Sequence, residues 1–192
     1  MSADSYDRWI GLTPWNCDPD VHPSAMIYPG VKLGRGVKVF PYAVIGGPAE
    51  IRGEWTGEGA IEIGDRTVIR ERVVIQGPTR IGGDCYIMDG THVAHDCVIG
   101  HGATLSPHVS LAGHVSVGDR ATVGMGALVH QHRTIGEGAM VGMGAVVTRD
   151  VPPWRLWYGN PARDHGPNTV GLDRWNGEQE DAMVAALREA YM

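Results

Sequence analysis

The chain has 192 residues, and its 16 Lys and Arg against 22 Asp and Glu give a formal charge of −6. This length predicts one domain with a small appendage. The acidic balance, without a basic run, argues against nucleic acid as a partner. No apolar run approaches the length of a membrane span, and the N-terminus has no apolar signal core. The three cysteines lack CxxC spacing, so we expect no disulfide framework and a reduced, cytoplasmic protein.

A six-residue period of aliphatic side chains begins at Val21, and we expect residues 1–20 to form an N-terminal extension. The first run of the period consists of Val21, Ile27, Leu33, Val39 and Ile45. It is interrupted at 46–60, a stretch that is polar and Gly-rich and contains Trp55. We interpret this stretch as an excursion loop on a rigid scaffold, and Ile51 within it as in phase only by coincidence.

Beyond the loop the same period continues without a break. Fifteen consecutive sixth positions are Ile, Leu or Val: Ile63, Ile69, Ile75, Ile81, Ile87, Val93, Ile99, Leu105, Leu111, Val117, Val123, Val129, Ile135, Val141 and Val147. The residue four places after each aliphatic is usually small or β-branched, as at Cys85 and Ala103. Neither a helix nor an alternating strand keeps this spacing. It predicts an all-β fold, a parallel β-helix over 21–151, with three hexapeptides in each eighteen-residue coil and five coils from this run.

The C-terminal part departs from the period. The paired prolines Pro152 and Pro153 predict the end of strand pairing, so we expect residues 152–192 to form a tail. A helix is predicted within it from Glu178 to Ala190, because acidic residues precede an apolar stripe. We expect that stripe to pack on the coil or to cover its open end.

Residues eighteen apart are expected to stack at one corner of neighbouring coils, and this gathers most of the histidines. Adding eighteen twice to His95 and to Asp96 generates two columns, His95–Gly113–Gln131 and Asp96–His114–His132. His92 and His130 lie close to these columns in the sequence. The spacing therefore predicts a histidine-rich edge that spans three coils.

This edge contains the groups needed for acyl transfer. A neutral imidazole such as His95 is the commonest general base near neutral pH. The adjacent carboxylate of Asp96 can orient the ring and stabilise its protonated form. Gly113 offers a backbone N–H with no side chain in the way, which suits an oxyanion donor. We therefore expect deprotonation of a hydroxyl or amine, followed by its attack on an acyl group.

Other interpretations remain open at this point. Corner histidines of a β-helix are often exposed and without function. Three histidines on one edge also suit a zinc site between subunits, as in a γ-carbonic-anhydrase-like enzyme, although no further carboxylate or thiol set has ligand spacing. A third interpretation is a trimeric binding protein that keeps the fold without the chemistry.

Four short segments carry a more specific signal. They are 87–100, which contains HVAHD at 92–96, then LAGH at 111–114, VHQ at 129–131 and DVPP at 150–153. Together they strongly resemble the UDP-N-acetylglucosamine acyltransferases of lipid A synthesis, over roughly residues 21–175. The resemblance implies a left-handed β-helix, an exception to the right-handed crossover rule. It also implies a homotrimer with active sites between subunits, an acyl carrier protein (or CoA) thioester as donor, and no metal cofactor.

The resemblance also assigns roles to residues. It implies His95 as the base, Asp96 as its orienting group and Gly113 as the oxyanion donor. The positions that match residues lining the cleft are His92, His114, His130 and Gln131. Asn168 and Arg174 match positions that hold the nucleotide, and an Arg suits a diphosphate. Met143 matches the position that sets acyl length, where a bulky side chain implies a shorter acyl chain.

The departures from the family fall where the acceptor would be recognised. The loop that contacts the sugar is replaced by 49–53, in which we expect Glu50 to substitute for an Asp. Trp175 stands where the family has a second phosphate-binding Arg and points to stacking on an aromatic group. The turn at 76–79 is shorter than the family's Gly-rich loop. Arg133 occupies an inward position, and we expect it to bend out because a buried lone charge is costly.

Overall fold

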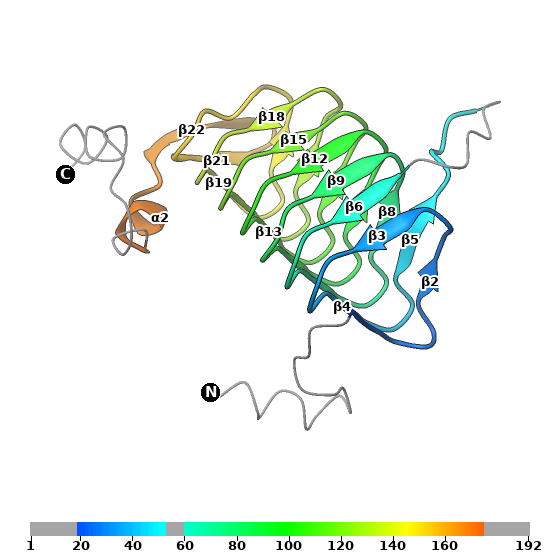
Figure 1. Cartoon of the computed structure of the whole chain (residues 1–192). Coiled ribbons are helices and arrows are strands. Elements are labelled where there is room, and N and C mark those ends of the chain that lie inside the picture. The colour runs from blue at the N-terminus through cyan, green and yellow to red at the C-terminus, as the bar shows by residue number, and fades with distance from the viewer. Residues whose placement is uncertain (1–18, 53–59, 175–192) are drawn as a thin grey trace.

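The computed structural model describes residues 19–52 and 60–174, which form a left-handed parallel β-helix with three faces (Figure 1). Each face is a parallel sheet in which neighbouring strands are three apart in chain order. The coils progress along one axis from the N-terminal to the C-terminal end, as the colours of Figure 1 show. The predicted fold class is confirmed.

Three sheets, named A, B and C, contain all the strands. Sheet A orders β1 (Asp20–Val21), β4 (Lys38–Val39), β7 (Val68–Ile69), β10 (Tyr86–Ile87), β13 (Thr104–Leu105), β16 (Thr122–Val123), β19 (Met140–Val141), β21 (Arg155–Gly159) and β22 (Ala162–Pro167). Sheet B orders β2 (Met26–Ile27), β5 (Val44–Gly47), β8 (Val74–Gln76), β11 (His92–Val93), β14 (Ser110–Leu111), β17 (Leu128–Val129) and β20 (Val146–Val147). Sheet C orders β3 (Val31–Leu33), β6 (Ile61–Ile63), β9 (Thr79–Ile81), β12 (Cys97–Ile99), β15 (Ser116–Val117) and β18 (Thr134–Ile135). A short helix, α2 (Thr169–Arg174), follows the last strand.

The periodic aliphatics form the core. All fifteen members of the long run are buried, with no more than 4% of their surface exposed. The small residues that follow them, such as Cys85 and Ala103, are buried beside them. Burial of each aliphatic side chain contributes about 1.5–3 kcal/mol. Strand pairing keeps the coils in register, with Val93 opposite Leu111 and Leu111 opposite Val129.

The corners between sheets form three edges, called B–C, C–A and A–B after the sheets that they join. The B–C edge contains residues 94–96, 112–114 and 130–132 from three successive coils. One residue in each of these corners, Asp96, His114 or His132, has a left-handed backbone, with φ between 58° and 61°. That conformation is uncommon for non-glycine residues, and Asp and His are among those that tolerate it. The corners consequently superpose coil upon coil, which the eighteen-residue columns predicted.

The excursion loop leaves the scaffold at the B–C edge, between β5 and β6. Both of its stems are held by the short turn of the coil above. Gly77 donates its N–H to the Gly47 carbonyl (3.2 Å), and Thr79 donates to the Ala60 carbonyl (3.4 Å). Ile51 is 39% exposed and does not belong to the core, which confirms that its phase is a coincidence.

The prediction that Pro152 and Pro153 end strand pairing is wrong. β21 pairs in parallel with β19, and β22 returns antiparallel beside it. The prolines lie in a corner, packed against Gly136, so their missing N–H groups do not interrupt a strand. Trp154 then takes the left-handed corner position, with φ 58°, and is buried. The predicted helix from Glu178 to Ala190 lies outside the described residues.

None of the helices in the described residues combines the length and the apolarity that a membrane-spanning segment needs.

Ile99 and Val98 are neighbours in β12 and point to opposite faces, with 2% and 48% of their surfaces exposed. We expect Ile99→Ala to lower the free energy of unfolding by about 2–5 kcal/mol, because it leaves a cavity between coils. The matched control Val98→Ala should lower it by less than about 1 kcal/mol. Urea denaturation followed by circular dichroism measures both values. Equal losses for the two variants would contradict the inward assignment of the period.

Candidate active site at the B–C edge

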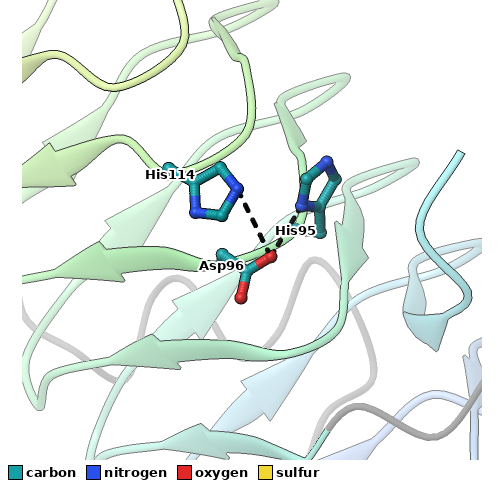
Figure 2. A group of neighbouring side chains, drawn as sticks. All are labelled: His95, Asp96 and His114. Carbon is teal, nitrogen blue, oxygen red and sulfur yellow. Dashed lines mark hydrogen bonds and ion pairs between the residues drawn. The ribbon is translucent and has the colours of Figure 1, made fainter. Parts of the chain in front are cut away.

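The B–C edge brings together the residues that sequence analysis placed there. His95 Nδ1 lies 2.7 Å from Asp96 Oδ2, and His114 Nε2 lies 3.8 Å from the same oxygen (Figure 2). The side chains of His95, Asp96 and His114 are 19%, 39% and 46% exposed. A carboxylate held at Nδ1 fixes the ring of His95 with its other nitrogen, Nε2, directed away from Asp96 (Figure 2). That nitrogen is available to accept a proton from a substrate.

Gly113 lies directly above the ring of His95. A Cβ atom at Gly113 would stand 2.7 Å from Cε1 and 2.8 Å from Nε2 of His95, so any larger residue in this position would displace the ring. The corner hydrogen bond is made by the next residue, since the N–H of His114 donates to the His95 carbonyl (3.0 Å). The N–H of Gly113 itself donates to no acceptor in the described part of the chain. It is therefore free to act close to the reactive nitrogen of His95.

A column of imidazoles continues up the edge from Asp96. The His114 ring meets that of His95 edge-on, with centroids 5.2 Å apart. The His132 ring stacks on His114 at 4.5 Å with an interplanar angle of 6°. The two histidines of the predicted Asp96–His114–His132 column thus contact each other in space, and His114 also contacts the His95–Asp96 pair.

The outer face of sheet B carries an apolar groove beside this edge, called the sheet B groove. It encloses about 400 Å³ and is lined by His92, Ala94, Ser110, Leu111, Ala112, Leu128, Val129, His130, Val146 and Thr148. Its lining follows from the eighteen-residue stacking of outward residues on β11, β14, β17 and β20. Two of the predicted cleft residues, His92 and His130, therefore line this groove on sheet B.

Gln131 and Arg133 lie higher on the edge. Gln131 is exposed, and its carbonyl accepts a hydrogen bond from Arg133 Nε (3.3 Å). Arg133 Nη1 pairs with Asp150 at 3.3 Å. The expectation that Arg133 bends out of the core is confirmed, because both of its partners lie on the outside of the coil.

Other predicted site residues lie elsewhere in the same chain. Asn168 lies at the C–A edge, where it donates from Nδ2 to the Gly138 carbonyl (2.9 Å) and accepts from the Gly171 N–H (3.1 Å). Met143 lies at the A–B edge and is 80% exposed. Glu50 is exposed near the stem of the excursion loop. The Arg174 side chain and Trp175 lie outside what the structure describes. One chain therefore does not bring Asn168 or Met143 to His95.

Cys97 adjoins Asp96 in sequence, but it is not a nucleophile in this site. Burial raises the pKa of its thiol to about 11, and the negative charge of Asp96 adds to the rise. Its Sγ donates inward to the Ala112 carbonyl (3.3 Å). A thiol in this state carries almost no thiolate near neutral pH. The Cys85 thiol also has a raised pKa because of burial. Both cysteines are free and serve as core residues.

Sequence analysis missed a second depression, on the outer face of sheet C. This pocket, called the Arg80 pocket, encloses about 320 Å³ and is lined by Ala60, Glu62, Pro78, Thr79, Arg80, Asp96, Cys97 and Val98. The signal was present, because Arg80 and Val98 are eighteen apart and pair in register. The His95–Asp96 corner consequently stands between an apolar groove on sheet B and a polar pocket on sheet C.

Comparison with known proteins first defines a class. A family model described as a bacterial transferase hexapeptide, with six repeats, matches residues 78–113. The acyl-[acyl-carrier-protein]–UDP-N-acetylglucosamine O-acyltransferase of Thiobacillus denitrificans is 36% identical over 214 residues, which cover 89% of this chain and 82% of that protein. The chain therefore belongs to the UDP-N-acetylglucosamine O-acyltransferase family. Against the enzyme of the same name from an Anaeromyxobacter strain, identity is 39% over 83% of this chain, which spans only 64% of that relative's length.

Solved structures agree with this assignment. The UDP-N-acetylglucosamine acyltransferase of Bacteroides fragilis superposes with a TM-score of 0.74 at 29% identity, covering 90% of this chain and 69% of that one. The Campylobacter jejuni enzyme has a TM-score of 0.71 at 28% identity, covering 89% and 82%. A GDP-perosamine N-acetyltransferase from Caulobacter crescentus, in complex with CoA and GDP-perosamine, is 34% identical with a TM-score of 0.50, covering 77% and 56%.

The contact between Gly113 and the His95 ring yields a structural test. We expect Gly113→Ala to turn the His95 ring away, because the new Cβ would overlap two of its atoms. The hydrogen bond to Asp96 should then lengthen beyond 3.5 Å in a crystal structure of the variant. The control is Gly47→Ala, whose added Cβ meets nothing closer than 3.9 Å. An unmoved ring in Gly113→Ala would contradict the close packing of these two residues.

Proposed function

We propose that this protein transfers an acyl group from an acyl carrier protein or CoA thioester to a hydroxyl or amine of a nucleotide-linked sugar. The observation that carries the proposal is the His95–Asp96 pair with Gly113 packed on the imidazole. Relatives named as acyltransferases for UDP-N-acetylglucosamine support it. The N-acetyltransferase complex with CoA keeps an amine acceptor and a CoA donor within the proposal.

In the proposed reaction, His95 Nε2 removes the proton from the acceptor hydroxyl or amine as that atom attacks the thioester carbonyl. The carbonyl oxygen, on which negative charge develops, accepts a hydrogen bond from the Gly113 N–H. The carbon–sulfur bond then breaks, and the leaving sulfur takes the proton from the His95 imidazolium. Asp96 acts throughout by holding Nδ1, which fixes the tautomer and stabilises the charged ring. No step of this reaction draws on a metal or an organic cofactor.

The two depressions beside the base divide the substrates by chemistry. The sheet B groove is mostly apolar and suits the acyl chain, with His92 and His130 close to the thioester. The acceptor would approach from the polar side, near His114 and Gln131. Glu50, on the excursion loop of the same edge, is available to contact the acceptor sugar. A small polar acceptor and an acyl carrier protein are thus the partners that the site suits.

We propose further that the active site is completed in a homotrimer. Because the faces of the three-sided coil separate its edges, His95, Met143 and Asn168 remain apart within one chain. Rotation about a threefold axis parallel to the coil keeps the height of each residue and turns a different face toward the neighbouring copy. Asn168, Arg174 and Met143 of one subunit would then line the same cleft as the His95 of the next, higher along the coil. The residues proposed for the nucleotide and for acyl length would thereby share one cleft with the base.

The reaction is proposed for the cytoplasm, where thioester donors are made. The buried free thiols of Cys85 and Cys97 fit a reducing compartment.

One observation favours a metal-dependent alternative. Ligand atoms of His95, Asp96 and His114 lie within 4.8 Å of one another, which is the spacing of a three-ligand zinc site. Against it, Asp96 Oδ2 is already the hydrogen-bond partner of His95. Metal analysis of the purified protein distinguishes the two, since stoichiometric zinc would favour the metal enzyme over the acyltransferase.

His95→Ala should lower kcat/KM by about 10²–10⁴-fold, because it removes the general base. The assay follows release of the free carrier thiol, with UDP-N-acetylglucosamine as acceptor and an acyl carrier protein thioester as donor, and identifies the product by mass spectrometry. The matched control is His101→Ala. His101 Nε2 also pairs with a carboxylate, Asp84 at 3.2 Å, but this pair lies at the C–A edge. Full activity in His95→Ala, or equal losses in both variants, would sink the proposal.

Mixed oligomers test the composite site. Alone, Met143→Ala should accept acyl chains longer than the wild type accepts, because it removes a bulky end wall. Excess His95→Ala chains, which keep Met143, should restore the short-chain preference when they are co-assembled with Met143→Ala chains. The only working bases in that mixture belong to Met143→Ala chains, so restoration requires a neighbour's Met143. If the mixture still prefers long acyl chains, Met143 acts within its own chain or not at all.

Light scattering of the wild-type protein should give three chains per particle.

A further inference from the structure

Outward-facing residues on neighbouring strands of sheet C form a row of mostly charged side chains that ends beside the His95–Asp96 corner. Lys32, Glu62, Arg80 and Val98 occupy facing positions on β3, β6, β9 and β12. Lys32 Nζ lies 3.0 Å from Glu62 Oε1. The pKa of Glu62 is lowered by the hydrogen bond from Lys32 and by the charge of Lys32, with Arg80 a smaller influence. Glu62 is therefore the ion-pair partner of Lys32, and Arg80 acts on it only through its charge.

Arg80 differs from most arginines of the described chain. Seven others each form an ion pair with an Asp or Glu: Arg35, Arg66, Arg70, Arg72, Arg120, Arg133 and Arg155. Arg80 is exposed, and within residues 19–52 and 60–174 no carboxylate forms an ion pair with it. The other acid of the pocket, Asp96, already contacts two imidazoles. Among the described residues, the Arg80 guanidinium therefore forms no ion pair, and Glu62, which faces it on the neighbouring strand, pairs with Lys32.

The Arg80 pocket adjoins the residues proposed for acyl transfer. Asp96 lines the Arg80 pocket and also holds the base, so a molecule seated in the pocket lies beside the His95–Asp96 corner. The pocket volume of about 320 Å³ accommodates a sugar ring with its substituents. A guanidinium binds the two oxygens of a carboxylate or phosphate at once, which fixes orientation as well as position.

We propose that the Arg80 pocket is an acceptor subsite in which Arg80 binds an oxyanion carried by the acceptor sugar. This inference rests on the proposed acyl transfer and names one class of acceptor for it. The oxyanion is either a carboxylate on the ring or the phosphate attached to it, since both present the same pair of oxygens. Arg80 is a residue that selects and positions the acceptor, in a pocket that Asp96 also lines.

The test uses two acceptors that differ at one group, UDP-N-acetylglucosamine and UDP-N-acetylglucosaminuronic acid. Kinetics and calorimetric titration are run on the wild type, Arg80→Gln and Arg80→Lys. We expect Arg80→Gln to raise KM and Kd by about tenfold while kcat stays nearly unchanged, because a charged hydrogen bond to the ground state is lost. Arg80→Lys should recover part of the loss, since a point charge replaces the fork. The control Arg163→Gln removes the same charge from exposed β22 and should change neither value.

Each outcome has one meaning. A loss confined to the uronic acid identifies the ring carboxylate, and an equal loss for both acceptors identifies the phosphate. If Arg80→Gln has the same KM and Kd as Arg163→Gln, the Arg80 subsite is refuted and the acyltransferase proposal is unaffected. If the wild type acylates neither acceptor, the acyltransferase proposal fails for them. The titration then still decides the subsite, because unchanged Kd values in Arg80→Gln overturn it and weakened binding supports it.

Discussion

Parallel pairing between residues eighteen apart is the constraint on which the whole molecule depends. Once Val93 pairs with Leu111 in the core, the corner residues that follow each of them must also superpose. That is why Gly113 lies on the ring of His95, and why the N–H of His114 reaches the His95 carbonyl. The site therefore inherits its precision from backbone hydrogen bonds and buried aliphatics. A side chain on such a rigid edge loses little further entropy when a substrate binds.

The same regularity limits what one chain can do. In the described part of the chain the core of the three-sided coil is filled, so polar groups lie on its outer faces and along its edges. His95 and Asp96 lie at one edge, Met143 at a second and Asn168 at a third. We propose that a symmetric copy of the chain provides the second surface that a substrate larger than one edge needs.

The segments proposed to select the acceptor, in contrast, lie where the repeat is broken. The excursion loop leaves the B–C edge below the base, and its stems at Gly47 and Ala60 are held by the short turn at 76–79. That turn and the start of β9 open the Arg80 pocket beside Asp96. The repeat thus fixes His95 and Gly113, and we propose that irregular segments on the same edge distinguish acceptors.

The sequence by itself determined the β-helix, its inward residues and the stacking of His95 with Gly113 and of Asp96 with His114. Because a strict six-residue period permits only one register, adding eighteen to a residue number was enough to find the residue stacked on it. Only the tertiary structure decided that β21 continues sheet A after the prolines, because a corner and a strand end look alike in sequence. Only the tertiary structure separated Asn168 and Met143 from His95, since their distances depend on which edge each occupies. It also revealed that Arg80 forms no ion pair with any described residue, because pairing between exposed side chains depends on their reach and direction, which no period encodes.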